Sequence, residues 1–145
     1  MADFLPYGRQ SVDESDVAAV AAVLRGDWLT TGPAVDRFEA DLAARTGGVP
    51  AVAATSGTAA LHVAYAAAGV GPGDEVVCAP MTFAATAATA ALLSATVVFA
   101  DVEPDTLTLD PAAAAAAVTG RTRVVSAVDY AGHPADKSDR SHVVL

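Results

Sequence analysis

Apolar positions in the first third of the chain recur at helical spacing. In residues 11–25, valine and leucine side chains return every three or four positions, which predicts an amphipathic helix. Ser11, with Glu14 three positions later, is typical of a capping box and predicts where this helix begins. A loop over residues 27–33 follows, and a second amphipathic helix is expected over residues 34–44.

Beyond Pro50, short apolar runs alternate with alanine-rich stretches. We expect strands at 51–54, 75–79, 96–100 and 123–128, and helices at 59–68, 83–93 and 111–119. This β-α-β-α-β-α-β order predicts the α/β class, with a mainly parallel sheet, right-handed crossovers and flanking helices.

Polar and glycine-containing segments follow the expected strands. In parallel α/β sheets, ligands bind beyond the carboxyl ends of the strands. The segments at those ends are therefore expected to converge on one site; they are residues 55–58, 80–83, 101–103 and 129–132.

The tripeptide Ser56-Gly57-Thr58 stands between an expected strand and an expected helix. Free amides at a helix start, a glycine that allows close approach and two hydroxyl groups form a cradle for an anion, most naturally a phosphate. The alternative is that Ser56 serves only as the N-cap of the helix. The residues alone leave both interpretations open.

Two aromatic residues lie outside the helical patterns. Phe83 follows a strand end, where its ring can lie flat on a planar ligand or, alternatively, pack a helix onto the sheet. Trp28, the single tryptophan, stands in a loop. It is interpreted either as a lid or interface residue or as a local plug.

Composition excludes several functional classes. The chain has 145 residues, and 17 acidic against 8 basic side chains give a net charge of −9, which argues against nucleic acid or an anionic membrane as partners. Only 6% of the residues are aromatic although 53% are hydrophobic, so a thin, alanine-rich core is expected. The single cysteine, Cys78, excludes a disulfide framework and fits a reducing compartment such as the cytoplasm.

Residues 46–73 and 76–100 lack charged side chains, but neither is expected to span a membrane. Turn and hydroxyl residues interrupt both stretches, and acidic rather than basic residues flank them.

Metal and hydrolase sites are not expected. The histidines and the cysteine show no metal-ligand spacing, no Ser/His/Asp arrangement is evident, and Asp101 with Glu103 is interpreted as a strand-end turn. His62 is expected at the core or its boundary.

Several motifs together resemble the DegT/DnrJ/EryC1/StrS family, pyridoxal-phosphate (PLP) dependent sugar aminotransferases of the aspartate-aminotransferase fold (PLP fold type I). The matching segments occur in order along residues 4–136, and they are residues 4–10, 27–33, 56–61, 71–76 and 82–83. The resemblance implies part of the large domain of that fold.

The resemblance also implies roles for individual residues. Gly57 and Thr58, beside Ser56, match residues that hold the cofactor phosphate, and Phe83 matches the aromatic residue that stacks on the pyridine ring. Residues matching the sugar-nucleotide pocket, which the family builds at a dimer interface, are Tyr7, Asp27, Trp28, Leu29 and Thr30. The implied partners are a UDP-4-keto-6-deoxy sugar of pseudaminic acid biosynthesis, glutamate as amino donor, and a second copy in a homodimer.

Transamination by this family needs a Schiff-base lysine and a carboxylate for the pyridine nitrogen. Both match positions beyond residue 145, whereas the single lysine, Lys137, lies in a polar tail and is expected to be solvated. We therefore expect an N-terminal portion without catalytic residues, inactive alone and with an open sheet edge, divided into residues 1–49, 50–136 and 137–145. The alternatives are a non-enzymatic phosphate- or PLP-binding fragment and a self-associating remnant.

Overall fold

The computed structural model describes residues 8–137 and 143–144. Contacts divide the chain into two units, residues 1–53 and 54–145, and each unit is described by itself.

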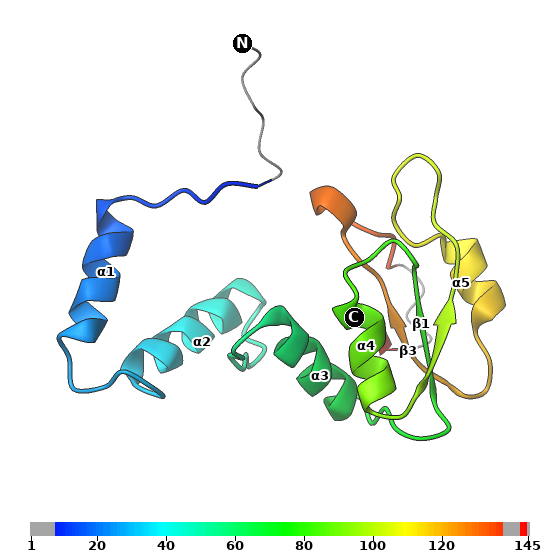
Figure 1. The fold of residues 1–145 in the computed structure, drawn as a ribbon, viewed down its shortest axis with the longest axis horizontal. Coiled ribbons are helices and arrows are strands. Elements are labelled where there is room, and N and C mark those ends of the chain that lie inside the picture. Colours follow the sequence, from blue (N-terminus) through cyan, green and yellow to red (C-terminus); the bar gives the residue numbers. More distant parts are fainter. Residues whose placement is uncertain (1–7, 138–142, 145) are drawn as a thin grey trace, which may run out of the picture. The chain divides into compact units, whose positions relative to one another are not determined.

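The first unit contains two helices, α1 (Glu14–Leu24) and α2 (Pro33–Arg45), and neither has a buried residue (Figure 1). The prediction that Ser11 caps α1 is wrong. The Asp13 carboxylate accepts the amides of Ser15 and Asp16 at 2.8 and 3.2 Å, and the Asp16 carboxylate accepts the amide of Asp13 at 3.0 Å. A carboxylate is favoured here because it is charged and faces the positive end of the helix dipole.

The second unit is built on a parallel sheet. Its strands are β1 (Glu75–Cys78), β2 (Thr96–Phe99), β3 (Thr122–Ser126) and β4 (Val143–Val144), and their order is β2-β1-β3-β4. Val77 pairs with Val98 on one side and with Val125 on the other. The expected open edge beyond β3 is partly covered, because β4 pairs with it in parallel.

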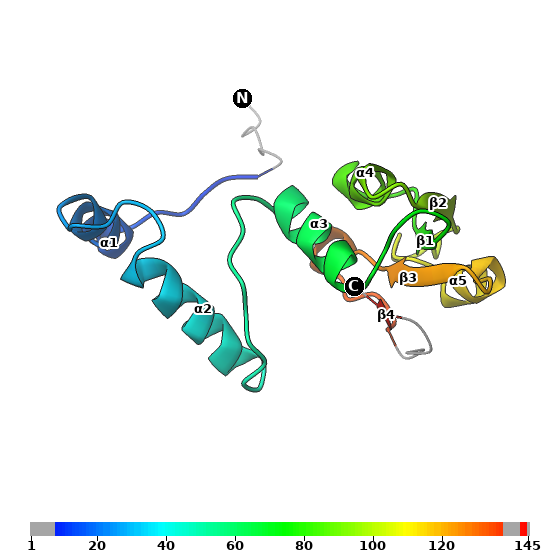
Figure 2. The same ribbon diagram turned by 90° about the horizontal axis from the view of Figure 1, so that it is seen from below.

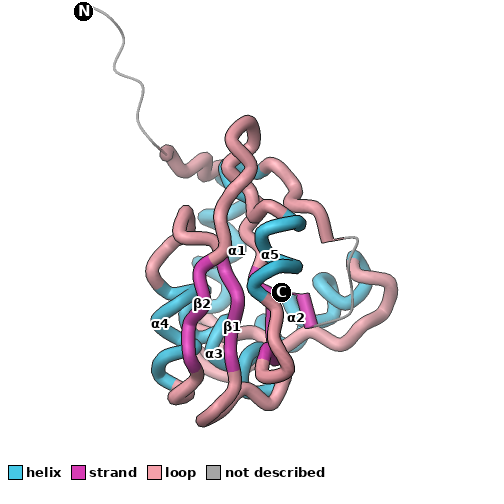
Figure 3. The backbone as a smooth tube through the Cα atoms, turned by 90° about the vertical axis from the view of Figure 1, so that its right-hand side faces the viewer, coloured by secondary structure: helices cyan, strands magenta, loops and turns pink. Residues whose placement is uncertain are grey.

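Helices cover both faces of this sheet. α3 (Gly57–Ala67) and α4 (Ala85–Leu92) lie on one face and α5 (Pro111–Ala117) lies on the other (Figures 2 and 3). Successive strand residues point to opposite faces, so Val76 packs with Tyr65 and Ala90, whereas Val77 packs with Ala114. Alanine and valine make up most of the buried hydrophobic set, as composition predicts.

The strand expected at residues 51–54 is absent: this segment forms no ladder, and the amide of Ala53 instead donates to a Glu39 carboxylate oxygen at 2.7 Å. Three of its four residues are alanine, which offers little cross-strand packing to hold a strand in place.

Among the described residues, the longest helix has 13 residues, and none is long and apolar enough to cross a membrane.

Candidate cofactor-binding site

The parallel strands end at a common edge of the sheet. The segments after β1, β2 and β3 therefore emerge together, as predicted for residues 80–83, 101–103 and 129–132. Residues 55–58 do not follow a strand. They precede α3, which packs beside α4 and runs in the same direction, so both helices begin toward this edge (Figure 1).

The first turn of α3 offers hydrogen-bond donors to solvent. The hydroxyl oxygen of Ser56 accepts the amide of Ala59 at 3.1 Å, so Ser56 is the N-cap of the helix. The first intrahelical bond runs from Ala60 to the Ser56 carbonyl, which leaves the amides of Gly57 and Thr58 without helical acceptors. Residues 56–58 are exposed, and a Cβ added at Gly57 would meet no atom within 4 Å. The cap and the anion cradle are thus compatible.

Phe83 lies in the loop between β1 and α4, because the helix begins at Ala85 rather than at residue 83. Its side chain is 79% exposed, so the alternative of a core aromatic residue is wrong. An exposed phenyl ring beside a strand end presents a flat apolar face to a ligand.

Hydrogen bonds to Thr86 brace this loop. The Thr86 amide donates to the carbonyl of Phe83 at 3.1 Å, and the hydroxyl groups of Thr82 and Thr86 lie 2.8 Å apart. The buried hydroxyl of Tyr65, on α3, donates to the Thr86 carbonyl at 3.0 Å. Burial raises the pKa of Tyr65, and a hydrogen bond from Ser126 partly offsets this rise.

The segment after β3 is stabilised around Asp129. Its carboxylate accepts the Ala135 amide at 3.0 Å and the Lys137 ammonium group at 2.8 Å; the hydrogen bond from Lys137 is the main cause of its lowered pKa. The turn Tyr130–Gly132 follows, and Ala131 adopts a left-handed conformation with φ of 52°. Lys137 is therefore ion-paired rather than simply solvated.

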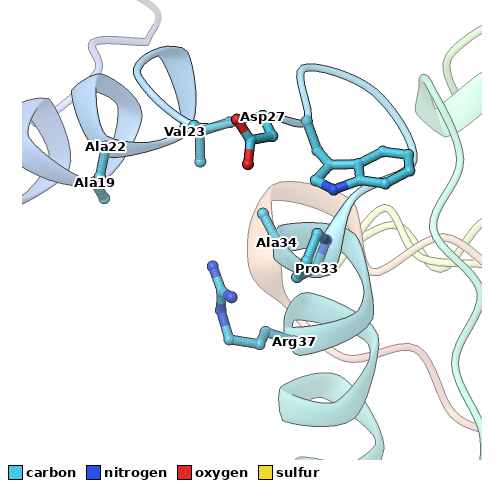
Figure 4. Close-up of a pocket in the computed structure, with 9 residues that line it drawn as sticks. Ala19, Ala22, Val23, Asp27, Pro33, Ala34 and Arg37 are labelled. Atoms are coloured by element: carbon cyan, nitrogen blue, oxygen red, sulfur yellow. The ribbon is translucent and has the colours of Figure 1, made fainter.

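The first unit has a cleft of its own, of about 470 Å³, between α1 and α2. The predicted residues Asp27 and Trp28 line it, and the Asp27 carboxylate and Arg37 guanidinium extend into the same space (Figure 4). Leu29 and Thr30 are exposed and do not line this cleft, and Tyr7 lies outside the described residues.

Trp28 packs against Gly32 although 62% of the tryptophan is exposed. A Cβ added at Gly32 would lie 2.5 Å from the Cβ of Trp28, so only glycine fits this close approach. This contact supports the local-plug interpretation, while the exposed indole face still lines the cleft.

The remaining candidates act locally. Asp101 caps its own turn by accepting the amide of Val102 at 2.8 Å, as predicted. The expectation that His62 lies at the core or its boundary is wrong, because this residue is exposed on α3. Within the described part of the chain, no group of His, Cys, Asp and Glu side chains is placed to hold a metal ion.

Sequence reasoning missed Tyr65, Thr86 and Arg37. Tyr65 is the one aromatic residue in the alanine-rich α3, and this could have indicated a special role. Its hydrogen-bond partner, Thr86, lies twenty-one positions later, and sequence spacing does not predict that contact. Arg37 carries no such signal.

A profile of the DegT/DnrJ/EryC1/StrS aminotransferase family matches residues 10–141. The chain belongs to this family. Solved structures with closely similar folds, two of them described as sugar aminotransferases, also confirm the predicted α/β fold.

Three of these structures have a TM-score of 0.85. A protein described as a sugar aminotransferase, Spr1654 from Streptococcus pneumoniae, is 33% identical in its PLP form, with 91% of this chain and 34% of that chain covered. The 3-amino-5-hydroxybenzoic acid synthase is 37% identical, covering 93% and 38%. The sugar aminotransferase CalS13 from Micromonospora echinospora is 31% identical, covering 93% and 37%.

The chain thus spans about a third of the length of these three proteins. Spr1654 is known in PLP and PMP forms, so this neighbour carries the cofactor that the sequence predicts.

Proposed function

We propose that this chain supplies the phosphate cradle and ring-stacking surface of a PLP-dependent sugar aminotransferase. The observation that carries the proposal is the pairing of two exposed features on adjacent elements. These are the free first-turn amides of α3 and the phenyl ring of Phe83 in the loop before α4.

The residues present fit the cofactor. Gly57 and Thr58 offer amides and a hydroxyl to a phosphate, and the open space at Gly57 admits one. Phe83 offers an apolar face to the pyridine ring. When bound, PLP supplies the electron-withdrawing ring that carries an amino group between donor and acceptor. The chain's own residues bind and orient it.

Equilibrium dialysis of the chain with PLP tests this proposal. We expect PLP to be retained, inorganic phosphate to compete, and pyridoxal without phosphate to bind more weakly. Phe83→Ala should weaken PLP binding by roughly tenfold, because the stacked ring contact is lost. Leu92→Ala, which removes another exposed apolar side chain (70% exposed), is the matched control and should bind PLP normally. Equal affinity in all three proteins would overturn the proposal.

The substrate that we propose is a UDP-linked 4-keto-6-deoxy sugar of pseudaminic acid biosynthesis, with glutamate as amino donor. The motifs in residues 6–10, 27–33 and 128–132 support it, since they resemble UDP-4-amino-4,6-dideoxy-N-acetyl-β-L-altrosamine transaminase. The cleft lined by Asp27, Trp28 and Arg37 adds support, because it combines an aromatic face with charges of both signs.

Trp28 provides the readout for the substrate, since it is the only tryptophan. Titration with a UDP-sugar should change its emission, and Arg37→Gln should weaken the response while Arg45→Gln, at the far end of α2, should not. A response to neither UDP-sugar nor UDP would exclude this cleft as the nucleotide-sugar site.

Homodimer formation is also proposed for the working enzyme, with Tyr7, Leu29 and Thr30 completing the sugar-nucleotide pocket. The exposed apolar side chains of α1 and α2 support it, because both helices lack a buried residue. Sedimentation of the chain and of Trp28→Ala tests this, with a dimer expected for the unaltered chain and weaker association for the variant.

The ion pair of Lys137 with Asp129 favours a second candidate function, PLP binding without a covalent link. Retained PLP together with no turnover of the sugar substrate would support this function for the 145-residue chain.

A further inference from the structure

Tyr65 is completely buried, yet it carries a hydroxyl group in an otherwise apolar cluster. A phenylalanine would fill the same space without a polar group that needs partners. The hydroxyl donates to the carbonyl of Thr86 at 3.0 Å. This single hydroxyl group therefore joins α3 to α4.

Thr86 passes this restraint to the loop that carries Phe83. Its amide holds the Phe83 carbonyl at 3.1 Å, and its hydroxyl lies 2.8 Å from that of Thr82, the residue before Phe83. Thr86 is only 5% exposed, so solvent does not compete strongly for these bonds. The backbone on both sides of the exposed ring thus depends on one buried residue.

Tyr65 also belongs to the helix whose first turn forms the phosphate cradle. It lies eight residues after Gly57, about 12 Å along a rigid helix. A rotation or slide of α3 relative to α4 would change the spacing between the cradle and the ring, and the Tyr65 hydrogen bond opposes this movement.

We propose that Tyr65 is a positioning residue: its hydroxyl sets the distance between the phosphate cradle at residues 56–58 and the ring of Phe83. The inference rests on the proposed function, because it assumes that one ligand engages both features. A ligand that uses only the cradle does not depend on the Tyr65 hydroxyl.

The test compares PLP with inorganic phosphate as ligands of the full 145-residue chain. Tyr65→Phe should weaken PLP binding by roughly three- to tenfold, the value of one buried hydrogen bond, and leave phosphate binding unchanged. In a Phe83→Ala background, Tyr65→Phe should have no further effect on PLP binding, because the ring on which it acts is gone.

Thr89→Val is the matched control. Thr89 is fully buried in α4 and its hydroxyl donates to the Ala85 carbonyl at 2.7 Å, so this variant also loses a buried hydrogen bond, but one that stays within the helix. It should bind PLP as the unaltered chain does, even where its melting temperature falls. Weakening of PLP binding by Thr89→Val as large as that by Tyr65→Phe would reduce Tyr65 to a stability role and overturn the inference.

Amide hydrogen exchange separates failure of the inference from failure of the proposed function. In Tyr65→Phe, the Thr86 amide should exchange faster while Val76–Cys78 in β1 keep their protection. If the unaltered chain does not retain PLP, the proposed function fails. The exchange rate of the Thr86 amide in Tyr65→Phe then decides whether the inference holds. Unchanged protection at Thr86, or unchanged PLP affinity in Tyr65→Phe, overturns the inference.

Discussion

The ammonium group of Lys137 lies 2.8 Å from a carboxylate oxygen of Asp129. The same oxygen accepts the amide of Ala135 at 3.0 Å, so the carboxylate ties the segment after β3 to the lysine that follows it. An ammonium group held by a carboxylate in this way is a poor nucleophile toward an aldehyde.

We therefore expect Lys137 to resist labelling by PLP. The pKa of Asp129 is lowered, chiefly by the hydrogen bond from Lys137, so the pair persists below the ordinary carboxyl pKa of about 3.9 and is lost only as pH falls through the lowered value. At neutral pH with equimolar PLP, borohydride reduction followed by peptide mass spectrometry should find little modified Lys137. Asp129→Asn should raise labelling several-fold; equal labelling in the two proteins would contradict the expected protection.

Cys78 is expected to be unreactive in the folded chain. It is completely buried in β1, and burial raises the pKa of its thiol to about 11. Since the thiolate is the reactive form, an aromatic disulfide reagent at pH 8 should label the native chain at least roughly a hundredfold more slowly than the chain in denaturant. Labelling at the unfolded rate by a chain with native circular dichroism would mean that β1 is not covered.

Gly32→Ala should disturb the loop that holds Trp28. The new Cβ would lie 2.5 Å from the Cβ of Trp28, so the indole or the backbone must move, at a cost of about 1–3 kcal/mol. The emission of this single tryptophan reports the shift, and thermal unfolding reports the cost. Gly71→Ala is the control, because a Cβ there meets nothing within 4 Å; an identical emission spectrum for Gly32→Ala and the unaltered chain would contradict the predicted clash.

Stability should fall in acid through Glu75. This carboxylate is 4% exposed, accepts the Thr119 hydroxyl at 2.5 Å and pairs with Arg121, and the Thr119 hydrogen bond is the main cause of its lowered pKa. A lowered pKa in the folded state stabilises the fold above the unfolded value of about 4.3, and this contribution disappears as pH falls.

The melting temperature of the unaltered chain should therefore drop between about pH 5 and about pH 3. Glu75→Gln should flatten this dependence, whereas Asp105→Asn, at an exposed turn position, should leave it unchanged. If the melting temperature of Glu75→Gln fell with pH as steeply as that of the unaltered chain, Glu75 would not be the cause of the acid sensitivity.

Local features of this chain could be predicted because their causes are local. Asp110 and Pro111 predict the start of α5, and the Asp110 carboxylate does accept the amides of Ala112 and Ala113 at 2.7 and 3.3 Å. The turn at Asp101 and the alternation of strands and helices beyond residue 70 follow from spacing in the same way.

Features that depend on distant partners could not be predicted. Residues 51–54 have the apolar pattern of a strand but form no ladder in the structure, because a strand exists only where a neighbour pairs with it. Phe83 is equally suited by its residue type to the core or to a ligand, and its 79% exposure follows from where α4 begins.

Amino-acid order was enough to indicate the family and the parallel α/β class, since both depend on motifs and hydrophobic spacing within short segments of the chain. The three-dimensional arrangement was needed to join Tyr65 to Thr86 and Lys137 to Asp129. Packing decides which distant groups meet in a hydrogen bond, and packing is the sum of many weak contacts across the whole unit. The spacing of two residues in the sequence therefore does not reveal such a bond.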